Sequence, residues 1–291
     1  RENCTAASHY LPPDNVQLSP PAESADRTSP TNIAMALSGA LSAAELGVTS
    51  GSEALTLCER ILDTLERLPK WKGHLYNWYE TKTLAVLEPA YISTVDSGNL
   101  AAALTACAAG FAAHGASRLA ERARSIAAAM NFRVLYDEKR RLFRIGLLPG
   151  ESAPAQSWYD LLESEERLTA YYAIASGQIE HRHWRQLSRA QVGYRGRRGM
   201  VSWSGSLFEY LMPELFLPLY RGSHLWESAR FAVYVQRRRT FGAKKLWGIS
   251  ESAFYAFDAT DHYRYKAHGC VPLTLCLGGS GESVVSPYSS Y

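Results

Sequence analysis

Residues 50–68 read SGSEALTLCERILDTLERL, and this stretch decides which kind of fold to expect. Ser50 and Glu53 have the spacing of a capping box, in which each side chain bonds the backbone amide of the other residue at a helix start. The apolar residues that follow recur every three to four positions and share one helical face: Leu55, Cys58, Ile61, Leu62, Leu65 and Leu68. The stretch predicts an amphipathic helix that packs through this face.

The pattern of one helix beside another repeats along the chain on both sides of this stretch. Ser29-Pro30 is an N-cap followed by proline at the first helical position, so we predict a preceding helix that starts there. Three further helix pairs are predicted at 99–113 with 117–130, at 159–176 with 180–187, and at 206–217 with 225–241. Residues 73–97 lack a helical period and are expected to form a long structured loop. Residues 132–147 resemble a short hairpin.

Four helix pairs with almost no strand pattern predict an all-α architecture, either a solenoid or a closed α/α toroid. No period of 20–50 residues repeats in the sequence, which favours the toroid. We therefore expect residues 1–291 to form a single α/α-barrel domain. The chain is irregular beyond Trp247 and ends at Tyr291 without the pairs that close a six-pair ring, so the barrel is expected to be incomplete.

The composition excludes several classes of protein. With 291 residues, 46% hydrophobic and 20% charged, the chain is long enough and apolar enough to bury a sizeable core. A net charge of +3 gives no global field that would attract nucleic acid, and we expect no nucleic-acid partner. The arginine runs 195–198 and 237–239 are interpreted as solvated loop and helix ends.

Targeting and redox signals are few. Five cysteines without a CxxC pair favour a reducing compartment. The longest charge-free apolar stretch, 100–113, is shorter than the ~18–20 residues that span a bilayer. Residue 1 is Arg, with no signal-peptide pattern after it, so a piece of a longer protein is expected.

The chain lacks the motifs of several common chemistries. It has no GxSxG, GxGxxG or Walker motif, and its histidines and cysteines show no metal-ligand spacing, so neither a metal nor a cofactor is expected. Four segments instead combine a carboxylate with bulky aromatic residues: 74–80, 91–99, 203–210 and 247–252. In a toroid these segments would gather at one mouth, and such surfaces suit a sugar chain. Cleavage of a glycosidic bond needs two acids.

Structural roles compete with these functional interpretations. Asp96 has the sequence context of a helix N-cap, and Glu209 is placed to favour the positive end of its helix. Glu80 fits a solvated acid in a loop as well as it fits a functional acid. The tryptophans of the four segments could equally be core residues. On pattern alone, Glu163, Glu165 and Glu166 form one solvated helix face.

Six motifs in order along the chain resemble a known family. They are HYLPPDN at 9–15, RTSPTNI at 27–33, GHLYNWY at 73–79, STVDSGNL at 93–100, SWSGSLFEYLMP at 202–213 and WGISESA at 247–253. Together they resemble the central glucoamylase-like domain of cyclic β-1,2-glucan synthases. The resemblance implies an (α/α)6 barrel that closes linear β-1,2-glucan into a ring by transglycosylation, with retention at the anomeric carbon.

The resemblance also implies particular site residues. The motif DLLESEERL at 160–168 places the acid/base on Glu165, and WGISE places the nucleophile on Glu251, which overturns the solvated interpretation of Glu165. Substrate-binding roles are predicted for the aromatic and acidic residues of the four segments, namely Tyr76, Trp78, Tyr79, Asp96, Trp203, Glu209, Tyr210 and Trp247.

The resemblance further implies a large parent protein of the bacterial inner membrane, with this domain on the cytoplasmic side beside glycosyltransferase and phosphorylase-like domains. The expected partner molecule is a β-1,2-glucan oligosaccharide or polysaccharide. Glu163 and Glu166 stand where small residues are usual, and their charge is expected to raise the pKa of Glu165. An endo-β-1,2-glucanase of related fold and a glucan-holding module without chemistry remain as alternatives.

Overall fold

A computed structural model of the chain describes residues 2–22, 24–150, 156–239, 246–257, 262–275 and 284–290. The chain divides into two compact units. The first comprises Arg1–Trp158 and Leu168–His181, and the second comprises Tyr159–Arg167 and Arg182–Tyr291. One domain over residues 1–291 stays a prediction. Cys276 and Phe241 lie outside the described residues.

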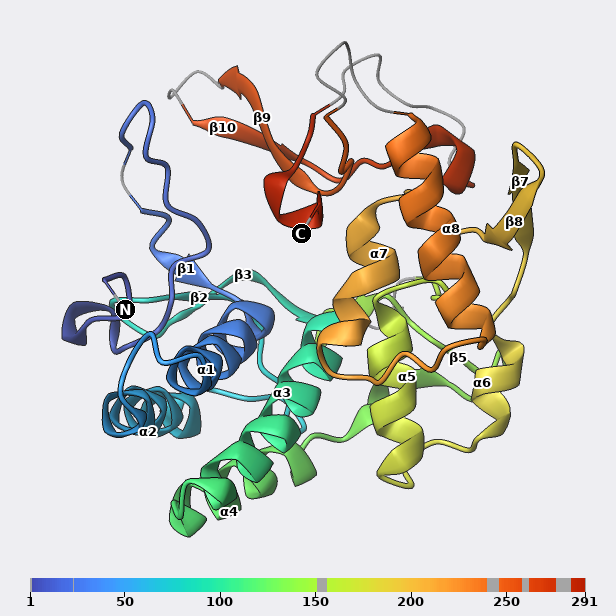
Figure 1. Cartoon of the computed structure of the whole chain (residues 1–291). Coiled ribbons are helices and arrows are strands. Elements are labelled where there is room, and N and C mark those ends of the chain that lie inside the picture. The colour runs from blue at the N-terminus through green and yellow to red at the C-terminus, as the bar shows by residue number, and fades with distance from the viewer. Residues whose placement is uncertain are drawn as a thin grey trace. The chain divides into compact units, whose positions relative to one another are not determined.

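The first unit is built around helices α1 (Pro30–Glu45), α2 (Gly51–Arg67), α3 (Thr94–Ala113) and α4 (Ser117–Ala128). Helix α1 packs against both α2 and α3, and α3 packs against α4 (Figure 1). The first two predicted helix pairs are therefore confirmed, apart from their exact ends.

Helices α1 and α2 begin with the capping residues that the sequence predicts. In α2 the Ser50 Oγ accepts from the Glu53 N–H at 3.2 Å, and Glu53 Oε2 accepts from the Ser50 N–H at 3.2 Å, which is the predicted capping box. In α1 the Ser29 Oγ accepts from the Asn32 N–H at 3.2 Å, ahead of Pro30. These bonds satisfy backbone amides that have no partner within the helix.

The predicted long loop at 73–97 is wrong, because two strands and the start of a helix lie within it. Strands β1 (Arg27–Thr28), β2 (Asn77–Glu80), β3 (Val86–Ser93) and β6 (Gly146–Leu147) form one antiparallel sheet in the order β1-β2-β3-β6. The outer partners are two-residue strands distant in sequence, so no local pattern announces the pairing. The predicted hairpin at 132–147 is borne out only in its middle, where β4 (Tyr136–Asp137) pairs with β5 (Leu142–Phe143). Its expected first arm is instead the 3-10 helix η2 (Phe132–Leu135), and its end pairs with β3.

Helix α3 begins at Thr94, five residues before the predicted start. Its N-cap is Ser93, whose Oγ accepts from the Asp96 N–H at 3.3 Å, so the interpretation of Asp96 as N-cap is wrong. Gly98 lies where α3 approaches α5 (Glu166–Ala175). A Cβ at Gly98 would lie 1.9 Å from the Thr169 Oγ1, so this approach requires glycine.

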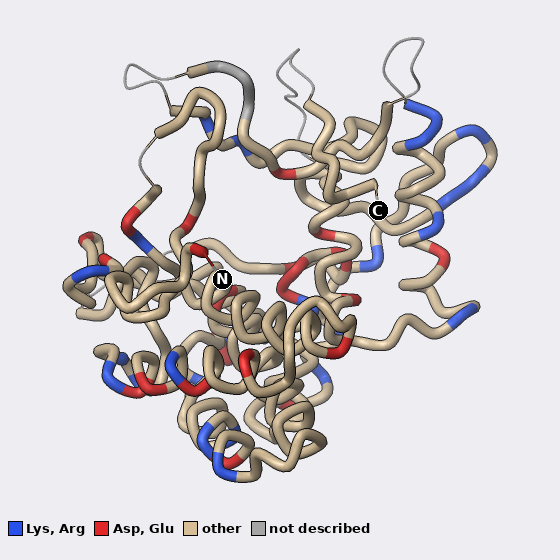
Figure 2. Tube along the Cα trace, turned by 60° about the vertical axis from the view of Figure 1, so that its left-hand side comes forward, with Lys and Arg blue, Asp and Glu red and all other residues tan. Residues whose placement is uncertain are grey.

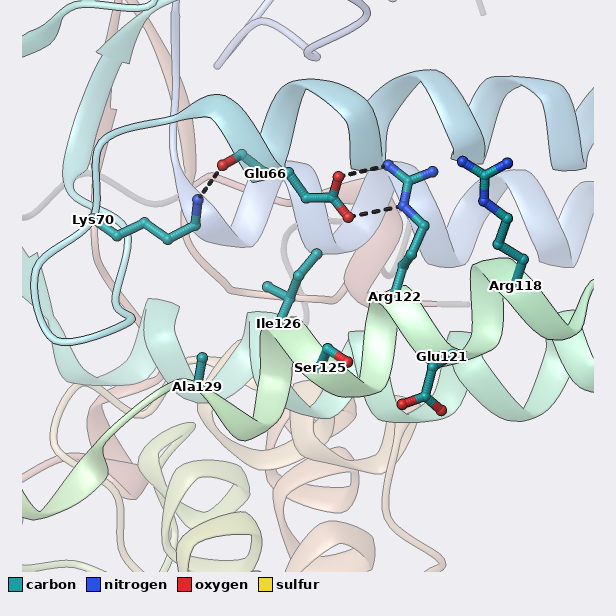
Figure 3. Close-up of a pocket in the computed structure, with 8 residues that line it drawn as sticks. All are labelled: Glu66, Lys70, Arg118, Glu121, Arg122, Ser125, Ile126 and Ala129. Carbon is teal, nitrogen blue, oxygen red and sulfur yellow. Dashed lines mark hydrogen bonds and ion pairs between the residues drawn. The ribbon is translucent and has the colours of Figure 1, made fainter.

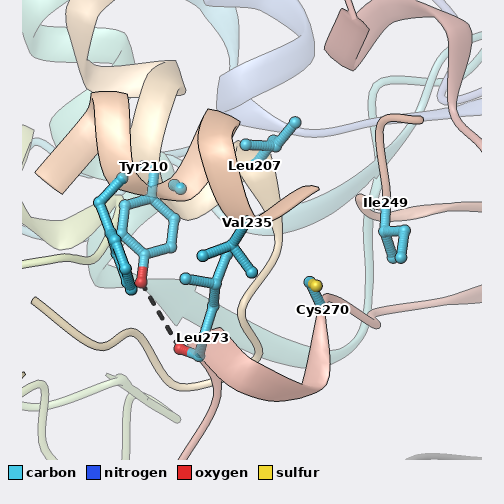
Figure 4. Close-up of a cluster of buried hydrophobic side chains, with 8 residues drawn as sticks. Leu207, Tyr210, Val235, Ile249, Cys270 and Leu273 are labelled. Atoms are coloured by element: carbon cyan, nitrogen blue, oxygen red, sulfur yellow. Dashed lines mark hydrogen bonds between the residues drawn. The ribbon is translucent and has the colours of Figure 1, made fainter. Parts of the chain in front are cut away.

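The second unit contains α6 (Arg182–Gln186), the hairpin β7 (Gln191–Tyr194) and β8 (Arg197–Met200), α7 (Leu207–Leu211), η3 (Met212–Leu215), α8 (His224–Arg238), the hairpin β9 (Ser252–Phe257) and β10 (Tyr263–Lys266), η4 (Val271–Leu273) and η5 (Pro287–Ser290). Its core joins residues from α7, α8, η4 and the segment before β9 (Figure 4). The buried members are Leu207, Tyr210, Phe231, Ala232, Val235, Ile249, Cys270 and Leu273. Four segments separated in the sequence thus share one apolar cluster.

The predicted helices of this unit are shorter than expected. Residues 159–165 precede α5 rather than belonging to it, because Ser188 pairs with their backbone: its N–H donates to the Asp160 carbonyl at 2.7 Å. Helix α7 ends ahead of Pro213, which has no N–H to continue the α-helical pattern. No helix in the described ranges is both long and apolar enough to cross a bilayer.

Candidate active site

The segment 247–251 is fastened to two helices and to the chain near its end. On α8, the fully buried Gln236 accepts from the Ile249 N–H at 2.7 Å and donates to its carbonyl at 2.9 Å. The Phe208 N–H of α7 donates to the Ser250 Oγ at 3.0 Å, and the Ser286 N–H donates to the Gly248 carbonyl at 2.8 Å. These contacts hold the backbone that carries the next residue, Glu251.

Gly248 makes this fastening possible. Its φ is +102°, a backbone conformation that side chains rarely adopt. A Cβ there would also lie 2.7 Å from the Ser289 Oγ. Residue 248 is therefore glycine for conformation and for space, which accounts for the second position of the WGISE motif.

Glu251 is partly exposed, and its carboxylate accepts a short hydrogen bond from the Tyr265 hydroxyl on β10. Burial raises the pKa of Glu251, the hydrogen bond from Tyr265 opposes that rise, and the negative charge of Glu209 adds to it. Tyr288 donates to the Ser250 Oγ at 2.8 Å and to the backbone carbonyl of Glu251 at 2.9 Å. Two tyrosines thus hold the residue, one by its carboxylate and one by its backbone.

Glu165 lies in the same electrostatic environment. The pKa of Tyr265 is raised by burial of its hydroxyl, then by the hydrogen bond and charge of Glu251, and also by the charges of Tyr288 and Glu165. Both predicted catalytic carboxylates therefore lie within electrostatic reach of one phenol, inside one compact unit. Their pairing was predicted from two motifs, whereas Tyr265 and Tyr288 were missed because the region beyond Trp247 was expected to be irregular.

The two glutamates that flank Glu165 are buried, so the solvated-face interpretation is wrong for them. Arg167 is fully buried and donates to Glu163 Oε2 at 2.5 Å and to Glu214 Oε1 at 2.9 Å. Glu166 faces His183 at 3.4 Å, and both are fully buried. Burial raises the pKa of Glu163 to about 7, against the opposing effect of Arg167. Glu163 and Glu166 are thus each paired inside the protein, with Arg167 and His183, and Glu165 alone of the three reaches the surface.

Glu209 has a structural role. It is 8% exposed, and its carboxylate accepts from the Ser202 Oγ at 2.9 Å and from the Ser204 N–H at 3.0 Å. It also accepts from the Ser204 Oγ at 2.5 Å, and its backbone N–H donates to the Ser206 Oγ at 3.3 Å, which closes a capping box on α7. This favours the capping interpretation over substrate contact.

Tyr79 and Tyr210 correct the predicted substrate-binding set. Both are fully buried. The Tyr79 hydroxyl donates to the Pro69 carbonyl at 2.5 Å, and the Tyr210 hydroxyl donates to the Met200 carbonyl at 2.8 Å. No ring face is open to a sugar, so both side chains belong to the core.

The remaining predicted residues are placed differently. Trp203, 40% exposed, and the partly buried Trp247 belong to the second unit with Glu251. Tyr76, Trp78 and Asp96 belong to the first unit, where they are partly buried. The mouth that all four segments were expected to share stays a prediction.

Two residues of the first unit have structural partners. The Arg27 guanidinium lies 4.8 Å from the Trp78 ring centre. Asp96 Oδ1 accepts from the Thr31 N–H at 3.3 Å, in the first turn of α1. Asp96 therefore stabilises the positive end of a helix, whatever else it contacts.

A cavity of about 570 Å³ lies in the first unit between α2 and α4 (Figure 3). Arg122 spans it, with Nε 2.8 Å from Glu66 Oε1 and Nη2 2.7 Å from Asp63 Oδ1. The Lys70 ammonium donates to the carbonyls that end α2, at 2.7 Å for Leu65 and 3.0 Å for Glu66. Arg122 and Glu66 pair across this cavity, and none of the predicted site residues lines it.

No group of three potential metal ligands occurs among the residues that the structure describes.

Comparison with known proteins finds one curated relative of the chain. No family model matches it. It is 30% identical, over 413 residues, to the cyclic β-(1,2)-glucan synthase NdvB of Rhizobium meliloti, an alignment that covers 98% of this chain and 15% of that protein. The chain therefore spans a small part of the length of this curated relative.

Solved structures with the same fold include two endo-β-1,2-glucanases. The enzyme from Chitinophaga pinensis, in complex with sophorotriose and glucose, matches with a TM-score of 0.72 and 16% identity, over 92% of this chain and 70% of that one. The enzyme from Talaromyces funiculosus, in complex with sophorose, matches with a TM-score of 0.75 and 14% identity, over 92% and 64%. A structure titled putative glucoamylase from Bacteroides fragilis matches with a TM-score of 0.71 and 17% identity, over 91% and 69%. The chain is thus similar to part of a cyclic β-1,2-glucan synthase, and it has the glucoamylase-like (α/α)6 fold in incomplete form, as its motifs indicated.

Proposed function

We propose that this chain acts on β-1,2-glucan as a glycoside-hydrolase-type transglycosylase, closing linear chains into rings with retention of the anomeric configuration. The observation that carries the proposal is that Glu251 accepts a hydrogen bond from the Tyr265 hydroxyl, and that the charge of Glu165 also acts on this hydroxyl. Paired carboxylates at a partly exposed position are the minimum equipment for breaking a glycosidic bond. The relatives named for β-1,2-glucan supply the substrate class.

Glu251 is assigned as the nucleophile. A nucleophilic carboxylate must be ionised and held in a fixed orientation. The Tyr265 hydrogen bond favours the ionised form of Glu251 and fixes one of its oxygens, while Gln236 and Ser250 immobilise the backbone on its N-terminal side. Attack on the anomeric carbon then gives a glycosyl-enzyme.

Glu165 is assigned as the acid/base. It protonates the leaving oxygen, directly or through a hydroxyl of the glucan, and afterwards removes the proton from the incoming sugar hydroxyl. Two successive inversions at the anomeric carbon give net retention. The Glu163–Arg167 and Glu166–His183 pairs hold the turn from which Glu165 projects.

Trp203 is assigned to substrate binding together with Trp247. An exposed indole face stacks on the apolar face of a pyranose ring, and 40% of Trp203 remains accessible. Tyr76, Trp78 and Asp96 are retained as candidate contacts from the first unit. No cofactor or metal is needed for this chemistry.

Hydrolysis is the competing outcome. It differs only in whether water or a sugar hydroxyl takes the glycosyl group from the enzyme. The endo-β-1,2-glucanase names of the structural neighbours favour it specifically. A module that holds glucan without chemistry is the third possibility.

The product of linear β-1,2-glucan separates these functions. We would incubate the 291-residue chain with the linear glucan and determine product masses. Rings are one water lighter than the corresponding chains, shortened chains indicate hydrolysis, and bound but unchanged glucan indicates a holding module. Linear β-1,3-glucan is the control substrate, and Glu251→Gln is the control variant. The proposal would be overturned if the chain neither converted nor bound β-1,2-glucan.

We also propose the setting of the chain. NdvB is several times longer than the matched segment. In this proposal, the chain belongs to a larger protein of the bacterial inner membrane and works on its cytoplasmic side. A glycosyltransferase domain would lengthen the glucan there, and a phosphorylase-like domain would trim it.

A further inference from the structure

A basic groove lies beside α8 in the second unit, and the proposed chemistry does not use it. It has a volume of about 780 Å³. Five arginines line it from two elements: Arg195 and Arg197 from the β7–β8 hairpin, and Arg230, Arg237 and Arg238 from α8. No acidic side chain lines it. Figure 2 shows Lys and Arg positions gathered on the hairpin and on the adjacent end of the helix.

Local geometry brings these charges together. In the hairpin, Arg195 and Gly196 both have positive φ, +48° and +77°, which gives a tight turn between paired strands. In α8, Arg230, Tyr234 and Arg237 are spaced four and three residues apart, so they share one helical face. The hairpin packs on α8, since Gly199 allows its backbone to approach Phe231.

These arginines have almost no acidic partners. Arg230 lies 3.6 Å from Glu227 at an exposed site. In the described ranges, no carboxylate lies within ion-pair distance of the other four. Arg197 instead lies 4.1 Å from the Tyr234 ring centre, and Arg238 lies 5.4 Å from the same ring. Stacking occupies the flat face of a guanidinium and leaves its N–H edge free to donate.

A second observation points to a missing acceptor. Trp226 also lines the groove, and its indole Nε1 is buried without a hydrogen-bond partner among the described residues. A buried donor of this kind normally has a partner. Among the described residues, the groove therefore combines four arginines that lack an acidic partner with a neutral donor that lacks an acceptor.

We propose that this groove binds an array of phosphate groups. The guanidinium fork matches the oxygens of phosphate, and its charge complements a polyanion that a neutral glucan does not resemble. The groove volume is that of a site for a small ligand. The phosphates come either from a free polyphosphate-bearing molecule or from neighbouring phospholipid headgroups. This inference does not depend on the proposed glucan chemistry.

The first test measures binding of sodium tripolyphosphate by calorimetry at constant ionic strength. The double variant Arg197→Gln/Arg237→Gln should bind it 10- to 100-fold more weakly, because charge-assisted hydrogen bonds are lost. The matched control is Arg118→Gln/Arg124→Gln, which removes two exposed charges from α4 of the first unit. The control should change affinity by less than about twofold. Equal weakening in both double variants would overturn the proposal, because it would show an effect of net charge alone.

Trp226→Phe sharpens the test. It keeps most of the ring and removes the N–H, so affinity should fall severalfold with the fold unchanged by circular dichroism. Unchanged affinity would exclude the indole as a donor and contradict that part of the proposal.

The second test distinguishes the two sources. The chain is sedimented with vesicles of phosphatidylglycerol, and with phosphatidylcholine as control. If the chain binds tripolyphosphate but does not sediment with either kind of vesicle, the ligand is a free molecule. If the chain sediments with phosphatidylglycerol and the double variant Arg197→Gln/Arg237→Gln does not, the ligands are lipid headgroups. The absence of both would overturn the proposal.

Discussion

The loops 203–209 and 247–251 look alike in sequence and do different things. Each begins with Trp, continues through Gly and Ser, and ends in Glu. In the first loop, Ser202, Ser204 and Ser206 direct hydroxyl and amide donors at Glu209, which therefore fixes the start of α7. In the second loop, the described residues direct one side-chain donor, Tyr265, at the Glu251 carboxylate.

The difference lies in how much of each carboxylate is left for a ligand. Glu209 accepts from several donors and is 8% exposed, so a substrate would have to displace internal bonds to reach it. Glu251 is partly exposed, and burial raises its pKa. The comparison teaches that an acid in an aromatic loop marks a site only when its neighbours leave an oxygen available. The predictions below test that distinction.

Glu251→Gln carries the largest expected effect. Loss of the nucleophile prevents the glycosyl-enzyme from forming, so ring formation and side hydrolysis should both fall by roughly 10³-fold or more. Product masses and reducing-end release measure this, with the thermal midpoint as a folding control. Near-normal turnover would remove the nucleophile assignment.

Glu165→Gln should have a large effect that depends on the substrate. With linear β-1,2-glucan, loss of the acid should cost roughly 10²- to 10⁴-fold in kcat/KM. An activated aryl glycoside needs little protonation of its leaving group, so it should retain much more of its rate. An equal loss on both substrates would contradict the acid/base role.

Glu209→Gln should affect stability rather than chemistry. The amide turns an NH₂ group toward donors that now bond a carboxylate, and the free energy of unfolding should fall by about 1–3 kcal/mol. The matched control is Glu227→Gln in the first turn of α8, where an exposed ion pair is worth under about 1 kcal/mol. Urea denaturation of both variants measures the difference. If the Glu209→Gln chain stayed stable but lost turnover, Glu209 would have a role in the chemistry rather than in the fold.

Tyr265→Phe should shift the pH dependence of activity. Burial raises the pKa of Glu251 and the Tyr265 hydrogen bond opposes the rise, so removing the hydroxyl raises that pKa further. A nucleophile must be ionised, and activity is lost as the pH falls through its pKa. The acidic limb of kcat/KM should therefore move to higher pH, with a loss of 10- to 100-fold.

The matched control for this shift is Tyr288→Phe. Tyr288 donates to the Ser250 Oγ and to a backbone carbonyl rather than to the Glu251 carboxylate, so its removal should leave the acidic limb in place. Identical profiles for both variants would exclude Tyr265 as the group that tunes Glu251.

Trp203→Ala carries the smallest expected effect. Loss of an exposed stacking face should weaken glucan binding about tenfold, with little change in the thermal midpoint. The contrasting variant is Tyr79→Ala, which empties a fully buried site and should cost about 3–5 kcal/mol of stability. Calorimetry and thermal melts would show the two effects separately. If Trp203→Ala lowered the stability instead, Trp203 would be a core residue rather than a binding residue.

Prediction from sequence succeeded where the cause is local. The capping box of Ser50 and Glu53 and the Ser29-Pro30 start depend on residues within one helical turn, and both occur as predicted. The predictions that failed depend on distant partners. The sheet at 73–97 needs residues near 27 and 147, and the turn before α5 needs Ser188.

The candidate site shows the same division. Motifs named Glu165 and Glu251, because residue type and order are carried by the sequence. Tyr265 was missed because its role comes from a hairpin that brings its hydroxyl to Glu251. Tyr79 and Tyr210 were assigned to sugar binding because aromatic character is visible in sequence, whereas burial is not.

The sequence by itself determined the starts of α1 and α2, the family resemblance and the choice of Glu165 and Glu251 as candidate acids. Only the tertiary structure decided which acids are available. Glu209 is satisfied by hydroxyl and amide groups of the serines three to seven residues before it, whereas Glu251 is partly exposed and receives its side-chain donor from Tyr265 on a separate strand. Burial depends on the segments that pack around each residue, so no local pattern encodes which acid stays partly exposed.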